Sequence, residues 1–180
     1  MRKLSIHELN RISTHQFKDA DKLPIVVVLD NVRSLNNVGS IFRTADAFRI
    51  EAIYLCGVTG TPPHREIQKT ALGATESVVW KHYTHTIDAI QELKNNKYTL
   101  IALEQVESGM HLQNFAPQKN NTYALVFGNE VSGVAQEIIN ACDSCIEIPQ
   151  FGTKHSFNIS VSAGIVLWDF YCKIKTTNQK

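Results

Sequence analysis

Arg43 is the first residue whose position raises a chemical question. It lies in the stretch NNVGSIFRTADAF, residues 36–48, which has the apolar spacing of a helix. Its neighbours Ile41, Phe42 and Phe48 are residue types that fill protein cores, where a charged side chain is uncommon unless it is paired. Arg43 therefore either extends to water along an apolar stem or performs a task at a binding site.

Further polar groups follow the segments that are predicted to be strands. Ligands of open α/β sheets bind beyond the carboxyl ends of the strands, so the loops at these ends are expected to converge on one edge. Asn37, Glu130 and Asn158 are the candidate polar groups in these loops. The four loops read DNVRSLNNVG after Leu29, EQVESG after Leu103, GNEVSG after Phe127 and PQFGTKHSFN after Ile148.

The elements that must position these loops alternate along the chain. Short apolar runs without polar alternation, typical of strands buried on both faces, occur at 25–29, 52–56, 77–80, 100–103, 123–127 and 146–148. Helical patterns lie at 5–12, 38–48, 64–72, 86–95, 134–141 and 156–174. This alternation predicts an α/β fold with a mainly parallel sheet.

The length and composition indicate a single globular domain. The chain has 180 residues, of which 43% are hydrophobic and 19% are charged. Residues 1–22 form a short N-terminal extension without an apolar segment typical of a signal peptide, and no apolar run is long enough to cross a membrane. The cytoplasm is therefore the expected location. With a net charge of +1, any nucleic-acid site must be a local patch.

Several common sites are not indicated. There is no GxGxxG or GxxxxGK[ST] motif for nucleotide phosphates and no HExxH or paired Cys/His spacing for a metal, so no metal is expected. Cys142 and Cys145 form a CxxC pair, which is either a redox motif or two ordinary buried thiols. The pair follows a predicted helix, and the C-terminal end of a helix does not activate a thiol, so ordinary thiols are favoured.

Three segments together resemble the SpoU/TrmH class of SPOUT RNA 2'-O-ribose methyltransferases. The first contains Asn37 and Arg43, the second is FGNEVSGV around Glu130, and the third is IPQFGTKHSFNISVSAG, which starts at Ile148. The segment QKTALGATES, residues 68–77, is also similar to a stretch of this class. The resemblance covers nearly the whole chain. One departure is Phe157, which stands where the class usually has Leu.

The resemblance implies a SPOUT-type sheet with helices on both faces, a deep trefoil knot near the C-terminus, and S-adenosylmethionine as cofactor. Arg43 is implied to act at the ribose hydroxyl, either as a general base or as a charged group that stabilises the developing alkoxide. The implied catalytic residues are Arg43, Asn37, Glu130, Ser156 and Asn158. The implied cofactor-binding residues are Leu103, Glu104, Phe127, Gly128, Ile148, Phe157 and Asn158.

The expected partners are RNA and a second copy of the chain. Arg33 and Lys154 lie in the implied active-site loops and are the candidate RNA contacts. The short segment before the first strand favours tRNA over rRNA. The resemblance implies a homodimer, in which Trp168, Phe170 and Tyr171 either form the contact or belong to the core. Two alternatives remain open, a non-catalytic RNA-binding protein of the same fold and a thiol-dependent oxidoreductase. Asn37 and Ser156, each taken alone, are candidate helix N-caps.

Overall fold

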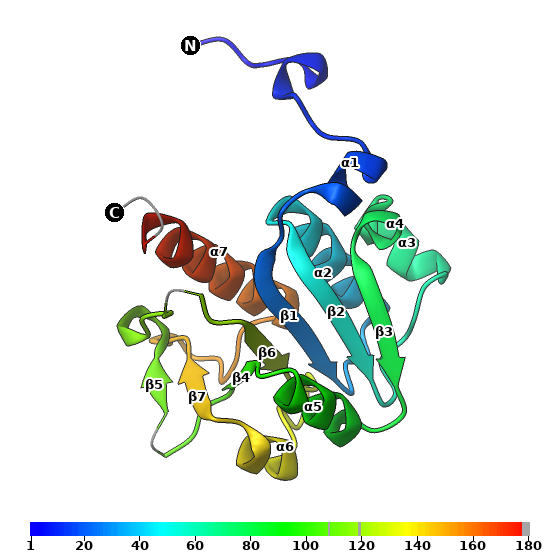
Figure 1. Ribbon diagram of the computed structural model, residues 1–180. Coiled ribbons are helices and arrows are strands. Elements are labelled where there is room, and N and C mark those ends of the chain that lie inside the picture. Colours follow the sequence, from blue (N-terminus) through cyan, green and yellow to red (C-terminus); the bar gives the residue numbers. More distant parts are fainter. Residues whose placement is uncertain (108, 119, 178–180) are drawn as a thin grey trace.

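A parallel β-sheet forms the centre of the computed structural model, which describes residues 1–107, 109–118 and 120–177 (Figure 1). The strand order among these residues is β3-β2-β1-β6-β4-β7-β5, and every pairing is parallel. The strands are β1 (Leu23–Asp30), β2 (Ile50–Cys56), β3 (Val79–Tyr83), β4 (Thr99–Leu103), β5 (Met110–His111), β6 (Tyr123–Phe127) and β7 (Ser144–Glu147).

Helices cover both faces of this sheet, which confirms the predicted α/β fold class (Figure 1). One face carries α1 (Thr14–Asp19), α2 (Leu35–Ala47), α3 (Arg65–Ala71), α4 (Ala74–Ser77) and α7 (Ile159–Thr177). The other face carries α5 (Thr86–Asn95) and α6 (Gln136–Ala141). Two 3₁₀ turns, η1 (Ile6–Leu9) and η2 (Leu112–Asn114), complete the described elements. No described helix is both long and apolar enough to cross a membrane.

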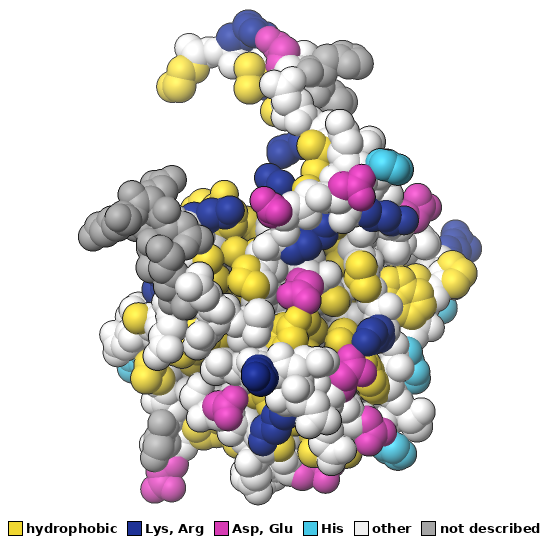
Figure 2. All heavy atoms as spheres, viewed as in Figure 1, with side chains coloured by type: hydrophobic (Ala, Val, Ile, Leu, Met, Phe, Trp, Pro, Cys, Tyr) yellow, Lys and Arg dark blue, Asp and Glu magenta, His cyan; other side chains and the backbone are white. Residues whose placement is uncertain are grey.

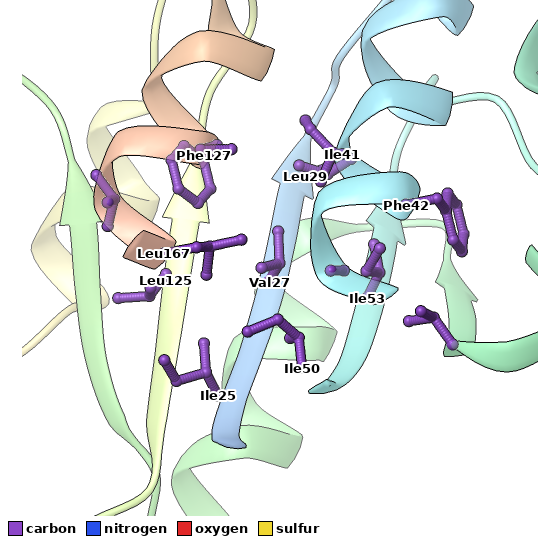
Figure 3. Packing of buried hydrophobic residues seen from close by; sticks show 14 of the residues in the cluster. Ile25, Val27, Leu29, Ile41, Phe42, Ile50, Ile53, Leu125, Phe127 and Leu167 are labelled. Atoms are coloured by element: carbon purple, nitrogen blue, oxygen red, sulfur yellow. The ribbon is translucent and has the colours of Figure 1, made fainter. Parts of the chain in front are cut away.

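The central strands are mostly apolar because both of their faces are buried. In β1, Ile25, Val27 and Leu29 point into the core beneath α2 and α7, whereas Val26 and Val28 point into the core beneath α5 and α6. Figure 3 shows the first of these cores, where side chains from β1, β2 and β6 meet those of α2 and α7. Buried packing on both faces therefore fixes the strand ends that carry the loops.

The predicted helix over 5–12 is wrong. The structure has only the 3₁₀ turn η1 there, and Asn10 ends it with a left-handed φ of 48°. The helix starts later, because Ser13 caps α1 by accepting a hydrogen bond from the Gln16 N–H while the Gln16 side chain accepts one from the Ser13 N–H. The segment before α1 projects from the body of the molecule (Figure 1).

The strand predicted over 77–80 starts two residues later in the structure, and four short elements, α1, α4, β5 and η2, were not predicted. Residues 74–77 form the short helix α4, in which the Ser77 hydroxyl donates to the Asp46 carboxylate at 2.5 Å, so β3 starts at Val79. The two-residue strand β5 and the four-residue helix α4 are too short for a periodic pattern. The other predicted strands and helices lie within three residues of the observed ones.

Candidate functional site

A pocket of about 550 Å³ opens at the carboxyl ends of β4, β6 and β7. This volume lies in the range of sites for small molecules and cofactors. Ser156 and Glu130 also line it. All seven residues that were predicted to bind the cofactor line the pocket, namely Leu103, Glu104, Phe127, Gly128, Ile148, Phe157 and Asn158.

Two glycines let the loops of the pocket pack backbone against backbone. A Cβ on Gly128 would lie 2.1 Å from the carbonyl carbon of Gly133, so no larger residue fits there without movement. Gly133 has a φ of 67°, a left-handed conformation that favours glycine, and its N–H and C=O pair with those of Asn129 at 2.9 Å. The loop after β6 is therefore held in one compact shape.

Glu104 fastens the loop after β6 to the loop after β4. Its carboxylate accepts hydrogen bonds from the N–H groups of Val134 and Gln105, each at 2.9 Å. A Cβ on Gly133 would lie 2.0 Å from the same carboxylate, which explains why this contact needs glycine. Glu104 thus shapes the wall of the pocket through its hydrogen bonds to the backbone.

The second functional feature is a hydrogen-bond network that joins the three resembling segments. The Asn37 side-chain amide donates to the Glu130 carboxylate at 3.2 Å, and the Asn158 side-chain amide donates to the Asn37 side-chain oxygen, also at 3.2 Å. Residues more than ninety positions apart in the chain are thereby joined at the rim of the pocket. We call these three side chains, Asn37, Glu130 and Asn158, the rim network.

Hydrogen bonds from backbone N–H groups lower the pKa of the Glu130 carboxyl group. Burial raises the pKa of this carboxyl, but hydrogen bonds from the backbone N–H groups of Arg33, Glu130 itself and Ser34, and from Asn37, outweigh burial and lower the pKa. The distances to the Arg33 and Ser34 nitrogens are 3.1 and 3.0 Å. Glu130 is therefore a carboxylate at neutral pH, and it holds the entrance of α2.

The residues that cap the two helices at the site are Ser34 and Asn158, not Asn37 and Ser156. Ser34 is the N-cap of α2, because its hydroxyl accepts from the Asn37 N–H at 3.3 Å, which leaves the Asn37 side chain free for the rim network. The final helix begins at Ile159, and Asn158 precedes it and accepts from the Ser160 N–H at 2.9 Å. The capping roles considered for Asn37 and Ser156 are therefore wrong, and the predicted start of the last helix at residue 156 was too early.

The remaining predicted contacts lie around the rim. Arg33 and Lys154 are exposed and do not line the pocket. Phe157, the departure from the usual Leu, lines the pocket and is 41% exposed. The Gln105 side chain donates to the backbone C=O of His155 at 3.0 Å, which ties the loop of residues 148–158 to the end of β4.

Asn129 is the main residue of the site that the sequence did not single out. Its side-chain N–H donates to the backbone C=O of Asn31 at 2.7 Å, and its side-chain oxygen accepts from the Val131 and Ser132 N–H groups. This side chain closes the junction between β1 and β6. An Asn two positions after a buried strand and next to Gly was the available signal, because such a residue can bond the backbone of its own turn.

Arg43 lies apart from the pocket. Its side chain is exposed and lines a second hollow on the other side of α2, formed with the N-terminal segment and α4. Arg43 follows Asn37 by six residues, which in a helix means about 9 Å along the axis and about 120° around it. A single copy of the chain therefore brings together Asn37, Glu130, Ser156 and Asn158 but leaves Arg43 outside.

The CxxC pair has the properties of ordinary thiols. Cys142 and Cys145 are free and half-buried, and Cys142 follows the C-terminal end of α6. Burial, with a smaller contribution from Cys145, raises the pKa of Cys142 to about 12, and burial also raises the pKa of Cys145. Neither sulfur is therefore an activated thiolate, which argues against the oxidoreductase alternative.

The fold and the site define an α/β protein whose ligand pocket is built from the loops at the carboxyl edge of a parallel sheet. The chain belongs to the SpoU rRNA Methylase family, whose model matches residues 24–168. This confirms the family that the three segments indicated.

Individual relatives agree with this assignment. The 23S rRNA (guanosine-2'-O-)-methyltransferase RlmB of Neisseria meningitidis serogroup B is 32% identical over 145 residues, which are 80% of this chain and 56% of that protein. The A. aeolicus TrmH/SpoU tRNA modifying enzyme has the same fold, with a TM-score of 0.80 at 24% identity over 92% of this chain and 82% of that chain.

An AdoMet-bound rRNA methyltransferase from Sinorhizobium meliloti has a TM-score of 0.77 at 26% identity, over 86% of this chain and 59% of that chain. The present chain spans between 56% and 62% of the length of the curated relatives that it matches.

Proposed function

We propose that this protein is an S-adenosylmethionine-dependent RNA ribose 2'-O-methyltransferase. The observation that carries the proposal is the rim network, which joins the three family segments beside a pocket of cofactor size. The name of the Neisseria relative includes the same reaction, and the Sinorhizobium relative binds AdoMet.

The pocket suits S-adenosylmethionine by its size and by its mixed lining. The half-buried side chains of Leu103 and Ile148 would face the adenine, while the backbone of Phe127 and of the glycine-containing loops would bind the polar parts of the ligand. The bound cofactor supplies a methyl group that is already activated as a sulfonium. The protein must add proximity, alignment and a route for the hydroxyl proton.

Arg43 would act at the ribose of the RNA. A guanidinium is costly to deprotonate at neutral pH, so we favour a charged Arg43 that binds the adjoining phosphate and stabilises the developing alkoxide, while the hydroxyl proton leaves to that phosphate or to water. Because Arg43 does not line the pocket of its own chain, it would act on the pocket of a second copy. Rim residues Asn37 and Glu130 would hold the start of α2 and thereby position this arginine.

The proposed homodimer has a suitable surface on α7. Val161, Ile165 and Trp168 are 49%, 36% and 56% exposed, and their spacing of four and three residues places them on one side of the helix. Phe170, by contrast, is fully buried and belongs to the core, and Tyr171 is half-buried against Phe48. Light scattering of the purified protein would test the dimer, and a monomer at micromolar concentration would contradict it.

Three further expectations belong to the same proposal. Residues 1–180 would act as one domain, and the chain between β7 and α7 would form the deep trefoil knot, which an experimental trace of residues 148–177 would test. Transfer RNA is the favoured substrate and ribosomal RNA the second, and the name of a curated relative from Staphylococcus saprophyticus includes both.

A methyl-transfer assay tests the proposed function. We expect the purified protein to bind S-adenosylmethionine in calorimetry and to transfer labelled methyl groups to tRNA or rRNA, with 2'-O-methylated nucleosides identified by mass spectrometry. Glu130→Ala should lose most of this activity, whereas Glu137→Gln, an exposed carboxylate on α6, is the matched control and should keep it. RNA binding without methyl transfer would instead favour the non-catalytic alternative.

A further inference from the structure

A second hollow, of about 520 Å³, lies where the N-terminal segment meets the C-terminal half of α2 and the turn between α3 and α4. Its floor is made of buried side chains and its edges are basic. Asp46 and Glu76 are its acidic residues. The buried side chains are Phe17, Ala71, Ala74 and Ser77, and the exposed basic ones are Arg11, Arg43 and Arg49.

The three arginines are free to bind an anion. Within residues 1–107, 109–118 and 120–177, none of their guanidinium groups forms an ion pair or a hydrogen bond. One oxygen of Asp46 already accepts the hydroxyl of Ser77. Three cations against two carboxylates give the hollow a positive balance in a chain whose total charge is only +1. On the face drawn in Figure 2, Lys and Arg side chains gather around the base of the N-terminal segment.

Arg49 occupies a backbone position that would suit glycine better. It follows the end of α2 with a φ of 51°, and its N–H donates to the Asp46 C=O at 3.0 Å. A left-handed conformation costs a side-chain-bearing residue about 1 kcal/mol relative to glycine. Since the Arg49 guanidinium forms no hydrogen bond or ion pair within the part of the chain that the structure describes, a role in binding explains its presence better than a role in stability.

We propose that this hollow binds the sugar–phosphate backbone of the RNA substrate. Arg11 and Arg49 bind the phosphates that flank the nucleotide whose ribose is presented to Arg43. A planar guanidinium donates two parallel hydrogen bonds to a phosphate, which makes arginine suited to this contact. Such contacts fix the position of the strand without reading its sequence. The proposal rests on the proposed function, because it takes RNA as the substrate.

Arg49→Gly is the sharpest test, because the change removes the guanidinium while it relieves the left-handed backbone. We expect the variant to melt at the same or a higher temperature and to bind S-adenosylmethionine normally. Its affinity for a fluorescently labelled tRNA should fall about tenfold at low salt, and the slope of log affinity against log salt should shrink by roughly 0.7 to 0.9. The Michaelis constant for RNA should rise by a similar factor.

Lys97→Gly is the matched control. Lys97 has a φ of 64° after the end of α5, so the change also removes one cation and one left-handed side chain, but Lys97 does not line the hollow. This variant should keep the wild-type salt slope. In a combined Arg11→Gln and Arg49→Gly variant, the slope of log affinity against log salt should decrease by about twice as much as in Arg49→Gly alone.

The outcomes separate this proposal from the proposed function. An Arg49→Gly variant with the wild-type salt slope would overturn the hollow as an RNA site even if the wild-type protein methylates RNA. If Arg49→Gly has a smaller salt slope but the wild-type protein binds tRNA without transferring a methyl group, the hollow is an RNA-binding site and the proposed methyltransferase activity is rejected. A change in oligomeric state together with an unchanged slope would identify the hollow as a contact between copies, which also overturns the proposal.

Discussion

The position of Arg43 gives the strongest prediction, because it decides which copy of the chain supplies the arginine. Asn37 and Arg43 lie on the same helix, yet only Asn37 reaches the rim network, and Arg43 is exposed on another side of α2. A separation of about 120° around the helix cannot be removed by a change of rotamer. We therefore expect Arg43 and the pocket that it serves to belong to different copies.

Mixing two inactive variants tests this arrangement. Arg43→Ala removes the arginine, and Asn158→Ala removes the amide that bonds Asn37 and the cap of α7. Arg43→Ala should lose roughly 100-fold in turnover, in line with the loss of one group that stabilises transition-state charge, and Asn158→Ala should lose most of its turnover because it damages the pocket. When subunits exchange freely in a 1:1 mixture, about half of the dimers are mixed and each holds one intact site, so about one quarter of wild-type activity should return.

A second mixture provides the control. Glu104→Ala and Asn158→Ala both damage the pocket of their own chain, so their mixed dimers contain no intact site and no activity should return. Arg43→Ala must also bind S-adenosylmethionine like the wild type. If the Arg43→Ala and Asn158→Ala mixture stays inactive although light scattering and labelled subunits prove exchange, the arginine acts within its own chain and the reasoning is refuted.

Three further predictions concern stability and reactivity. Asp30 is 2% exposed and accepts hydrogen bonds from the Thr86 hydroxyl, the Asn31 amide and the Ala135 N–H. Asp30→Ala should therefore lower the free energy of unfolding, measured in urea titrations, by about 2–4 kcal/mol. A loss below about 1 kcal/mol would contradict this role. Hydrogen bonds from Lys81, Tyr83 and Tyr54 lower the pKa of Glu92 from 4.5 to about 2.

The carboxylate of Glu92 therefore stabilises the fold above pH 4.5, and this contribution disappears as the pH falls from 4.5 to 2. Because the side chain is 35% exposed, Glu92→Gln should cost only about 1–2 kcal/mol at pH 7, with the difference vanishing near pH 2. The raised pKa of Cys142 predicts slow reaction with a thiol reagent at pH 7, and a rate equal to that of an exposed model thiol would contradict the burial argument.

The sequence predicted the sheet well because its evidence was local and strong. The runs 25–29, 52–56 and 123–127, which form most of β1, β2 and β6, are apolar at every position, and their short length favours strands buried on both faces. The pocket followed from the same pattern, since the end of each strand fixes where its loop begins. Leu103, Phe127 and Ile148 could thus be assigned to the pocket from strand ends and family resemblance together.

The arrangement within the site depended on contacts that no local pattern encodes. The bonds between Asn37 and Glu130 and between Asn37 and Asn158 join segments from different parts of the chain. The choice of Ser34 as N-cap was equally hidden, because Ser34, Asn36 and Asn37 are all good capping residues. The direction of Arg43 could not be predicted either, since a single charged residue in an apolar helix points wherever packing leaves space.

The absence of a phosphate-binding motif in the sequence now has a structural reason. In this sheet the direction of the connections reverses between the neighbouring strands β1 and β6. Helix α2 connects β1 to β2 across one face of the sheet, whereas α6 connects β6 to β7 across the other face. Such a junction is where open α/β sheets usually bind ligands, often a phosphate at a helix N-terminus.

Here the protein's own side chains take that place. Glu130 accepts the Arg33 and Ser34 N–H groups at the entrance of α2, and Asn129 bonds the C=O of Asn31 across the junction. The carboxylate occupies two N–H donors at the entrance of the helix that a phosphate could use, and its negative charge lies beside the positive end of the helix. The ligand pocket consequently lies one step along the sheet, over the ends of β6, β4 and β7, and the loop that carries Glu130 forms part of its wall.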